Sequence, residues 1–223
     1  MRLAMALIRA EFHCHTYYSD DSLTLPQALL EECERKQIDR LVVTDHNSIG
    51  GALEAQKLDP QRFIVGEEVR TTAGELLAFF VQEALPRGLM PLAAIQRLKA
   101  QNAFICVSHP MDPRRGWKLP ALLEILPYID ALETFNSRCL WRSWNKSALI
   151  FAQQHNLPGI SGSDAHTLDE VGRSTMSLAD FKDAEELRRV IRQAVPHNRL
   201  SGWGVNIASA RAMELKRRNL PKT

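Results

Sequence analysis

Residues 7–15 have the sequence Leu-Ile-Arg-Ala-Glu-Phe-His-Cys-His, a short, mostly apolar run that ends in two histidines. Residues 7–12 predict a buried strand, because apolar runs of this length are typical of sheet cores. In a strand, side chains two positions apart point to the same side. His13 and His15 are therefore expected to face one side together, with Cys14 turned away. The stretch predicts a strand that carries two potential metal ligands at its carboxyl end.

Strand-like and helix-like segments alternate along the rest of the chain, and this alternation predicts an α/β fold with a largely parallel sheet. The short link around 72–74 predicts a hairpin and hence one antiparallel pair. A length of 223 residues fits one large domain. The expected strands are 7–12, 40–44, 62–69, 76–81, 103–107, 129–135, 158–161 and 175–178, and the expected helices are 26–36, 49–57, 92–100, 119–126, 137–155 and 184–194.

Charge is unevenly distributed. The net charge is +2, but residues 199–223 carry +5 and the remainder therefore −3. A basic end of this kind can contact nucleic acid or anionic lipid, although it is more often a solvated helix end. Apolar residues at helical spacing predict an amphipathic helix over 205–220. We expect a catalytic domain over 1–200 and a helical extension over 201–223, with packing on the barrel favoured over subunit pairing or a membrane surface.

Cysteine usage and the amino terminus indicate the compartment. The four cysteines form no C-x-x-C pair and suggest neither a disulfide framework nor a zinc motif. Residues 1–10 are too short, and too interrupted by Arg2 and Arg9, for a signal peptide. No apolar run approaches the roughly 18 residues of a membrane span. We therefore expect a cytoplasmic protein without a membrane span.

Histidines and carboxylates follow most of the other expected strands as well. Active sites of barrels and open α/β sheets form at the carboxyl ends of strands, so these side chains are expected to meet. Neutral imidazole and ionised carboxylate are the groups that metal ligation requires. Five of the seven histidines fall at such strand ends, which chance placement does not readily explain. The candidates are His13, His15, Asp20, Asp45, His46, Glu67, Glu68, His109, Asp164 and His166.

Taken together, these segments resemble the polymerase and histidinol phosphatase (PHP) family of metal-dependent phosphoesterases. The resemblance covers residues 11–178, roughly three quarters of the chain. It implies a distorted (β/α)7 TIM-like barrel in a single domain, with two or three divalent metal ions (Mn, Fe or Zn) at its mouth. The motifs that carry it are Glu11-Phe12-His13-Cys14-His15-Thr16, Ser19-Asp20, Thr44-Asp45-His46-Asn47, Gly66-Glu67-Glu68-Val69, Ser108-His109-Pro110, Glu133-Thr134-Phe135-Asn136 and Gly162-Ser163-Asp164-Ala165-His166.

The resemblance also implies how the ligands divide among the metals. Relatives often place a histidine about seven residues past the bridging glutamate, where this chain has Glu75. We expect Glu75 to ligate and to favour Mn²⁺ or Fe²⁺ over Zn²⁺; the alternative is that it points away and leaves the second site weak. The implied sets are His13, His15, Glu68 and Asp164 for the first metal, Glu68 and His109 for the second, and Asp20, His46 and His166 for the third.

Other residues are expected to assist these ligands. Arg138 and Arg173 are candidates to grip a phosphate as bidentate forks, and Arg114 with Arg115 would recruit anions if their loop overhangs the site. The implied catalytic residues are Asp164 as proton acceptor, Glu68 and His166. Residues expected to orient the ligands are Glu11, which replaces the usual aspartate, Asp45 and Asn47.

The expected function is hydrolysis of a phosphate ester by a metal-activated hydroxide. The substrate is a small phosphorylated metabolite, a nucleotide or an oligonucleotide end, and the basic end mildly favours nucleic acid. One alternative is an amidohydrolase-like hydrolase, but no lysine stands at a suitable strand end. Another is a degenerate barrel that binds a nucleotide or a protein, against which the nearly complete ligand set argues. Substrate, metal and oligomeric state stay open.

Overall fold

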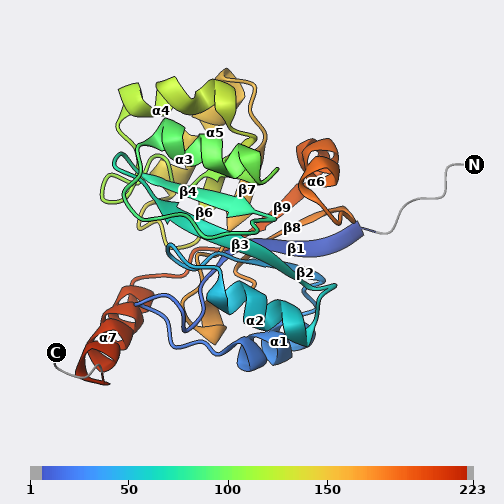
Figure 1. The fold of residues 1–223 in the computed structure, drawn as a ribbon, viewed down its shortest axis with the longest axis vertical. Coiled ribbons are helices and arrows are strands. Elements are labelled where there is room, and N and C mark those ends of the chain that lie inside the picture. Colours follow the sequence, from blue (N-terminus) through green and yellow to red (C-terminus); the bar gives the residue numbers. More distant parts are fainter. Residues whose placement is uncertain (1–6, 220–223) are drawn as a thin grey trace, which may run out of the picture.

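A nine-stranded sheet curves into a nearly closed barrel in the computed structural model, which describes residues 7–219 (Figure 1). The sheet order is β7-β6-β5-β4-β3-β2-β1-β8-β9. In chain order the elements are β1 (Leu7–Cys14), α1 (Pro26–Arg35), β2 (Arg40–Val43), α2 (Gly50–Leu58), β3 (Phe63–Arg70), β4 (Glu75–Phe79), α3 (Pro91–Ala100), β5 (Phe104–Val107), α4 (Leu119–Ile125), β6 (Ala131–Asn136), α5 (Arg142–Gln154), β7 (Gly159–Gly162), β8 (Ser174–Ala179), α6 (Ala184–Val190), β9 (Val195–Asn198) and α7 (Gly204–Asn219).

Parallel pairing dominates the barrel. The pairs β1–β2, β2–β3, β5–β6 and β6–β7 are parallel, whereas β4 runs antiparallel to both β3 and β5. The predicted hairpin between β3 and β4 is thus confirmed. Figure 1 shows α1 and α2 on one side of the sheet and α3, α4 and α5 on the other. The predicted TIM-like α/β barrel in one domain is confirmed.

The end of β1 pairs with the segment that follows β7, and this pairing closes the barrel at its mouth. His15 N donates to Ala165 O over 2.8 Å, and Cys14 forms an isolated bridge with Ala165. The other end of β1 pairs instead with β8, which is antiparallel to it and carries β9 at the sheet edge. The opening between β7 and β1 is therefore closed where the candidate ligands lie.

Stacked rings fill the lower interior of the barrel. The Phe79 ring lies 5.7 Å from that of Phe12 and 5.5 Å from that of Phe104, and Phe12 also stacks on Phe181 at 6.0 Å. All four side chains are buried, and Leu187 of α6 belongs to the same cluster. This apolar floor supports the polar mouth above it.

Two element predictions differ from the structure, and one strand was not predicted. The helix predicted over 137–155 begins only at Arg142, because Asn145 uses its carboxamide to bond both the N–H and the carbonyl of Asn136 and so holds a turn there. The helix predicted over 184–194 ends at Val190 and continues as a 3₁₀ turn. Strand β9 was not predicted; Pro196 is tolerated there because β9 is an edge strand.

Helix α7 lies beside the mouth of the barrel. The Lys216 ammonium contacts the carbonyls of Tyr17 and Ser19 and lies 4.4 Å from the Tyr17 ring centroid. The predicted helix end at Leu220 falls outside the described residues. All four cysteines are buried and unpaired. Across residues 7–219, every helix is too short or too polar to cross a membrane.

Candidate metal centre

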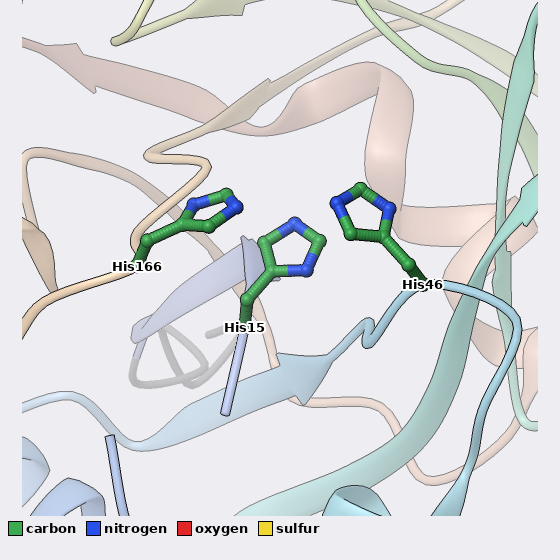
Figure 2. Close-up of side chains that lie close together, drawn as sticks. All are labelled: His15, His46 and His166. Atoms are coloured by element: carbon green, nitrogen blue, oxygen red, sulfur yellow. The ribbon is translucent and has the colours of Figure 1, made fainter. Parts of the chain in front are cut away.

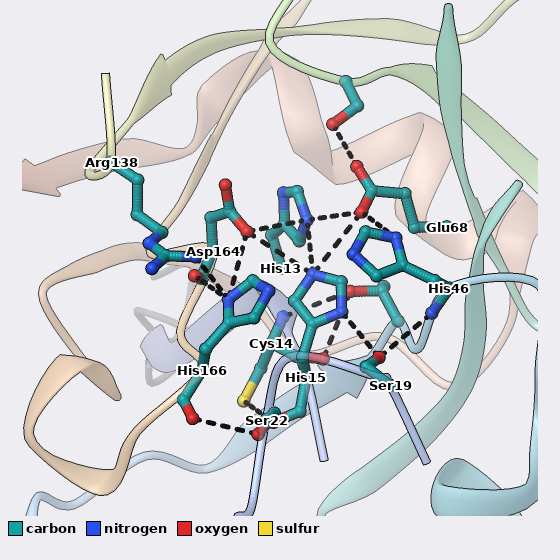
Figure 3. Close-up of polar contacts among 12 residues, drawn as sticks. His13, Cys14, His15, Ser19, Ser22, His46, Glu68, Arg138, Asp164 and His166 are labelled. Carbon is teal, nitrogen blue, oxygen red and sulfur yellow. Dashed lines mark hydrogen bonds and ion pairs between the residues drawn. The ribbon is translucent and has the colours of Figure 1, made fainter. Parts of the chain in front are cut away.

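The imidazoles of His15, His46 and His166 converge at the mouth of the barrel (Figure 2). They come from the end of β1 and from the loops after β2 and β7. Glu68 on β3 and Asp164 after β7 face the same space (Figure 3). The sequence therefore placed the main cluster at the correct strand ends.

A bulge in β1 aims His13 into this cluster. Glu11 pairs with Leu41 and Cys14 with Val43, so β1 has one residue more than β2 over this interval. An extra residue breaks the strict alternation of side chains. As a result, Phe12 packs in the interior core while His13, the next residue, also reaches the interior from the mouth.

A second bulge, in β6, accompanies a carboxylate that the sequence analysis quoted but gave no role. Glu133 Oε1 lies 2.8 Å from His13 Nδ1, and its Oε2 accepts hydrogen bonds from His109 N (2.7 Å) and Asn136 Nδ2 (3.0 Å). A charged residue inside a buried strand needs hydrogen-bond or ionic partners. The position of Glu133 in an otherwise apolar strand was therefore the sequence feature that could have indicated its role. Glu133 thereby orients His13 and anchors the backbone of His109.

Strained backbone marks three of the loops that carry site residues. His109, Asp164 and Asn47 have φ values of +26°, +54° and +50°. Residues other than glycine rarely adopt positive φ, and such outliers gather at functional sites. These turns follow β5, β7 and β2 and direct the chain back across the mouth.

The first ligand set has the geometry of a cation site. His13 Nε2 and His15 Nε2 are 3.1 Å apart, and each lies 3.4–3.5 Å from Glu68 Oε2 and Asp164 Oδ1. Two ligands about 2.1 Å from a tetrahedral ion are separated by about 3.4 Å. Each of these five contacts therefore has about the length expected between two ligands of one divalent ion.

Hydrogen bonds on the far side of both rings leave these nitrogens free to ligate. Glu133 accepts the proton of His13 Nδ1. Ser19 Oγ donates to Asp45 Oδ1 (2.7 Å), so it accepts from His15 Nδ1 at 3.0 Å. When both rings are neutral, each Nε2 presents a lone pair toward the other. Two facing lone pairs repel unless a cation lies between them, and the residues therefore fit a metal ion.

Two further ligand sets flank the first. His109 Nε2 lies 3.2 Å from Glu68 Oε1 and 3.3 Å from Glu75 Oε2 without forming a hydrogen bond to any described residue. His166 Nε2 lies 3.0 Å from Asp21 Oδ2, and His46 Nε2 lies 3.8 Å from Asp21 Oδ1. Glu75 thus faces the second set, as the sequence analysis expected.

The prediction for Asp20 needs correction. Asp20 is exposed, and its neighbour Asp21 faces His46 and His166. Ser19 N donates to Thr16 O, and Ser22 N donates to Ser19 O, so the chain turns over this interval and sends consecutive side chains in different directions. Asp20 matches the family motif, but the adjacent carboxylate, Asp21, is the one that points inward, and the motif does not distinguish the two.

Electrostatics favour the ligating forms of His15 and Asp164. Burial opposes protonation of His13, His46 and His109, but the neighbouring carboxylates raise the pKa of each of these rings above its usual value. Burial, reinforced by repulsion from His166 and His46, lowers the pKa of His15 to about 3, so its ring is neutral. Burial opposes ionisation of Asp164, but His13 and Arg115 hold the pKa of its carboxyl well below the usual range. The mouth thus combines a neutral imidazole with an ionised carboxylate.

The residues expected to orient ligands act in different ways. Asp45 accepts hydrogen bonds from Thr16 N (2.7 Å) and from Ser19, and so acts on His15 through Ser19. Glu11 accepts from Gly172 N over 2.6 Å and ties down the loop after β7. Asn47 accepts from Arg70 N over 3.4 Å. Glu11 and Asn47 therefore hydrogen-bond to the surrounding backbone and do not orient the imidazole of a ligand.

Glu67 alternates with Glu68 and points away from the mouth, where both of its oxygens accept from Leu85 N at 3.1 Å. Burial raises the pKa of Glu67 from 4.5 to about 7. The folded state therefore retains a proton that the unfolded chain loses, and this contribution to stability falls as pH rises from about 4.5 to about 7.

Glu67→Gln is expected to remove this slope in the metal-free protein. Relative to wild type, the variant should gain about 2 kcal/mol of unfolding free energy between pH 5 and pH 8. Urea unfolding in chelator at both pH values measures the gain, with the exposed Glu124→Gln as control. An equal difference at the two pH values would contradict the prediction.

Arginines surround the cluster. Arg115 Nη1 lies 2.6 Å from Asp164 Oδ2, Arg70 Nε lies 2.8 Å from Glu75 Oε1, and Arg138 Nη1 lies 2.9 Å from His166 Nδ1. These three line one cavity of about 540 Å³ together with Arg114, His46, Asp164 and His166.

Arg138, which the sequence predicts to grip a phosphate, lies in this cavity. Arg70 also lines it, although no sequence pattern singles it out, and Arg115 does so through the loop expected to overhang the site. Arg173 does not line this cavity; its backbone instead bonds Glu170 and Arg199.

Known proteins resemble this chain in sequence and in fold. A family model described as PHP-associated matches residues 142–196. The uncharacterized protein MJ0417 of Methanocaldococcus jannaschii is 33% identical over 181 residues, which cover 78% of this chain and 72% of that protein. The sequence relationship thus extends over most of both chains.

Two solved structures share the fold at low identity. One is a two-domain protein of Bacteroides vulgatus that contains a predicted PHP-like metal-dependent phosphoesterase; its TM-score is 0.72 at 17% identity, over 87% of this chain and 66% of that one. The other is the lesion-specific endonuclease EndoQ of Pyrococcus furiosus, with a TM-score of 0.60 at 17% identity, over 84% of this chain and 56% of that one. At these identities the likeness concerns the fold alone.

Proposed function

The chain belongs to the PHP family of metal-dependent phosphoesterases, and from this premise we propose that it hydrolyses a phosphate ester at the mouth of its barrel. The observation that carries the proposal is the convergence of His13 Nε2, His15 Nε2, Glu68 Oε2 and Asp164 Oδ1 at the mouth. It is supported by the arginines around the same cavity, since guanidinium groups match phosphoryl oxygens.

Two or three divalent ions, of Mn, Fe or Zn, would be held by the three adjoining ligand sets. His13, His15, Glu68 and Asp164 would hold the first ion. Glu68, Glu75 and His109 would hold the second, and Asp21, His46 and His166 the third. Such ions activate a water molecule for attack on phosphorus and offset the charge of the phosphoryl group.

The protein's own residues would position the ester and take up a proton. Asp164 presents Oδ1 to the first ligand set, whereas its Oδ2 contacts Arg115 (2.6 Å) and Asn136 Nδ2 (3.2 Å). An ionised carboxylate at this point is suited to accept the proton of the attacking water. Arg115 and Arg138 flank it and would bind the non-reacting phosphoryl oxygens.

The substrate is either a small phosphate ester or the end of an oligonucleotide. The basic residues of α7 favour nucleic acid, and the fold is shared with an endonuclease. Contacts to several phosphates would make substrate affinity fall steeply with salt. A KM for a 5′-phosphorylated oligonucleotide that does not change between low and high salt would argue for the small ester.

The direct experiment is hydrolysis in Mn²⁺ of nitrophenyl phosphate and of a short 5′-phosphorylated oligonucleotide, with Asp164→Ala as the control. Turnover that is lost in the control supports the proposal, and the preferred ester separates a phosphatase from a nuclease. Absence of turnover by protein with measured bound metal would favour a different hydrolysis, such as that of an amide, or a binding role.

Glu75→Ala is expected to lower the metal content by about one ion per chain, because the second set would keep only Glu68 and His109 as ligands. Glu75→His should restore it, since an imidazole can occupy the same place. Metal analysis after dialysis against Mn²⁺ or Fe²⁺ measures both variants. Unchanged content in Glu75→Ala would show that Glu75 serves only as the partner of Arg70.

A further inference from the structure

We propose that a buried ion pair between Glu170 and Arg138 enables the third ligand set to hold a divalent ion. The inference rests on the proposed metal-dependent function and adds Glu170 as a positioning residue that acts through Arg138 and His166. Glu170 is fully buried and Arg138 is 6% exposed. Buried ion pairs contribute little net stability, because desolvation of both charges offsets their attraction. A pair at this depth beside a candidate ligand therefore indicates a role in the site.

One oxygen of Glu170 closes the loop that carries His166. Its Oε2 accepts hydrogen bonds from His166 N (3.2 Å) and Thr167 Oγ1 (3.0 Å). The backbone reinforces this turn, since Glu170 N donates to Thr167 O over 3.1 Å. Residues 167–170 begin with threonine and end with glutamate, the pattern of a helix capping box, and they form a short 3₁₀ helix over Leu168–Glu170. These contacts engage Oε2 and not Oε1.

The other oxygen of Glu170 faces Arg138, and its Oε1 lies 3.1 Å from Arg138 Nε. Arg138 follows β6 and Glu170 follows β7, so the pair joins the loops after two neighbouring strands. Neither atom forms a hydrogen bond elsewhere in the described chain, and Glu170 is the only carboxylate that pairs with Arg138 among residues 7–219. Each charge therefore depends on the other for compensation.

Arg138 connects the pair to the ring of His166. Its Nη1 lies 2.9 Å from His166 Nδ1 (Figure 3), whereas its Nη2 donates to Val205 O (2.9 Å) and Ser209 Oγ (2.7 Å). The last two partners belong to α7 and are uncharged. The guanidinium is thus fixed against a candidate ligand, and its compensating charge comes from Glu170.

The charge of Arg138 opposes cation binding by the same ring. His166 Nε2, on the opposite side of the imidazole, lies 3.0 Å from Asp21 Oδ2 and would ligate the ion. A guanidinium this close would repel a divalent ion, and the repulsion is strong in a buried site because little water screens it. The Glu170 carboxylate offsets that charge. Arg138 can therefore hold the ring of His166 in place without weakening its affinity for a cation.

The test titrates Mn²⁺ alone into the metal-free protein, without an ester. The ion of the third set is identified as the one that Asp21→Ala loses. Glu170→Gln keeps the shape of the side chain and removes its charge, and we expect it to weaken binding of this ion by about tenfold to a hundredfold. The double variant Arg138→Met/Glu170→Gln removes both charges, which buried pairs tolerate, and should bind the ion with nearly wild-type affinity. Asp169→Asn, the same loss of charge at the exposed neighbour of Glu170, is the matched control and should leave binding unchanged.

Equal weakening in Glu170→Gln and in the double variant would show that Glu170 only closes the turn, and would overturn the role of the ion pair. Unchanged Mn²⁺ binding in Glu170→Gln, or the absence of any ion that Asp21→Ala loses, would overturn it as well. Turnover of nitrophenyl phosphate is measured separately. Weaker Mn²⁺ binding that the double variant restores, without hydrolysis by wild type, would support the ion pair while rejecting the phosphoesterase. Hydrolysis by wild type together with unchanged Mn²⁺ binding in Glu170→Gln would reject the ion pair alone.

Discussion

Glu68→Gln is expected to reduce bound divalent metal and to lower phosphoester turnover by about a hundredfold to a thousandfold. Glu68 contacts members of all three ligand sets. Its Oε2 lies 3.5 Å from His13 Nε2 and 3.0 Å from His46 Nδ1, and its Oε1 lies 3.2 Å from His109 Nε2. Glutamine keeps the shape but loses the negative charge and one acceptor oxygen.

The charge is the decisive loss. Burial opposes ionisation of Glu68, but His13 and His46 hold the pKa of its carboxyl well below the usual range. A neutral carboxamide cannot bridge two cations as a carboxylate does. Metal analysis after dialysis, together with kcat in Mn²⁺, measures the two effects separately.

Glu67→Gln provides a matched control for Glu68→Gln. It is the same chemical change in the adjacent residue of β3, but the side chain points away from the mouth toward Leu85. We expect wild-type metal content and turnover in this variant. If the two variants lost metal equally, the assignment of Glu68 as the bridging ligand would be wrong.

Phe79→Ala should lower the free energy of unfolding by about 4 kcal/mol. The Phe79 side chain is fully buried and stacks between the rings of Phe12 and Phe104 at 5.7 and 5.5 Å. Its removal loses the transfer free energy of the ring and leaves a cavity, because the closed strands around it cannot collapse to fill the space. Urea unfolding of the metal-free protein measures the change.

The matched control for Phe79→Ala is Leu92→Ala on α3, since Leu92 is 40% exposed and removes little buried surface. It should change stability by less than about 1 kcal/mol. A loss of under about 2 kcal/mol for Phe79→Ala would mean that the floor of the barrel is loosely packed. Phe12 lies in the same stack and immediately precedes His13, so we also expect Phe79→Ala to weaken metal binding measurably.

Local patterns in the sequence were sufficient for the order of the strands and helices other than β9, and for most of the ligand types. Short apolar runs form strands because they bury both faces of a parallel sheet, and this holds for β1 and β2. The carboxyl ends of such strands meet at one mouth, which brought His15 and His46 together as predicted. Alternation along β3 separated Glu68 from Glu67 for the same local reason.

Turns and long-range contacts were beyond the reach of these patterns. The inward direction of Asp21 instead of Asp20 depends on a turn whose geometry no periodicity encodes. The contact of Glu133 with His13 joins residues 120 positions apart, and that of Arg115 with Asp164 joins residues 49 positions apart.

Composition and spacing specify which strand ends supply side chains to the mouth, but not which residue of a turn points inward, as Asp20 and Asp21 show. The partner of each charged group at the mouth depends on how the loops pack against one another in the closed barrel. The physical reason is that strand direction is a property of a few neighbouring residues, whereas charge pairing in a buried site is a property of the whole packed chain.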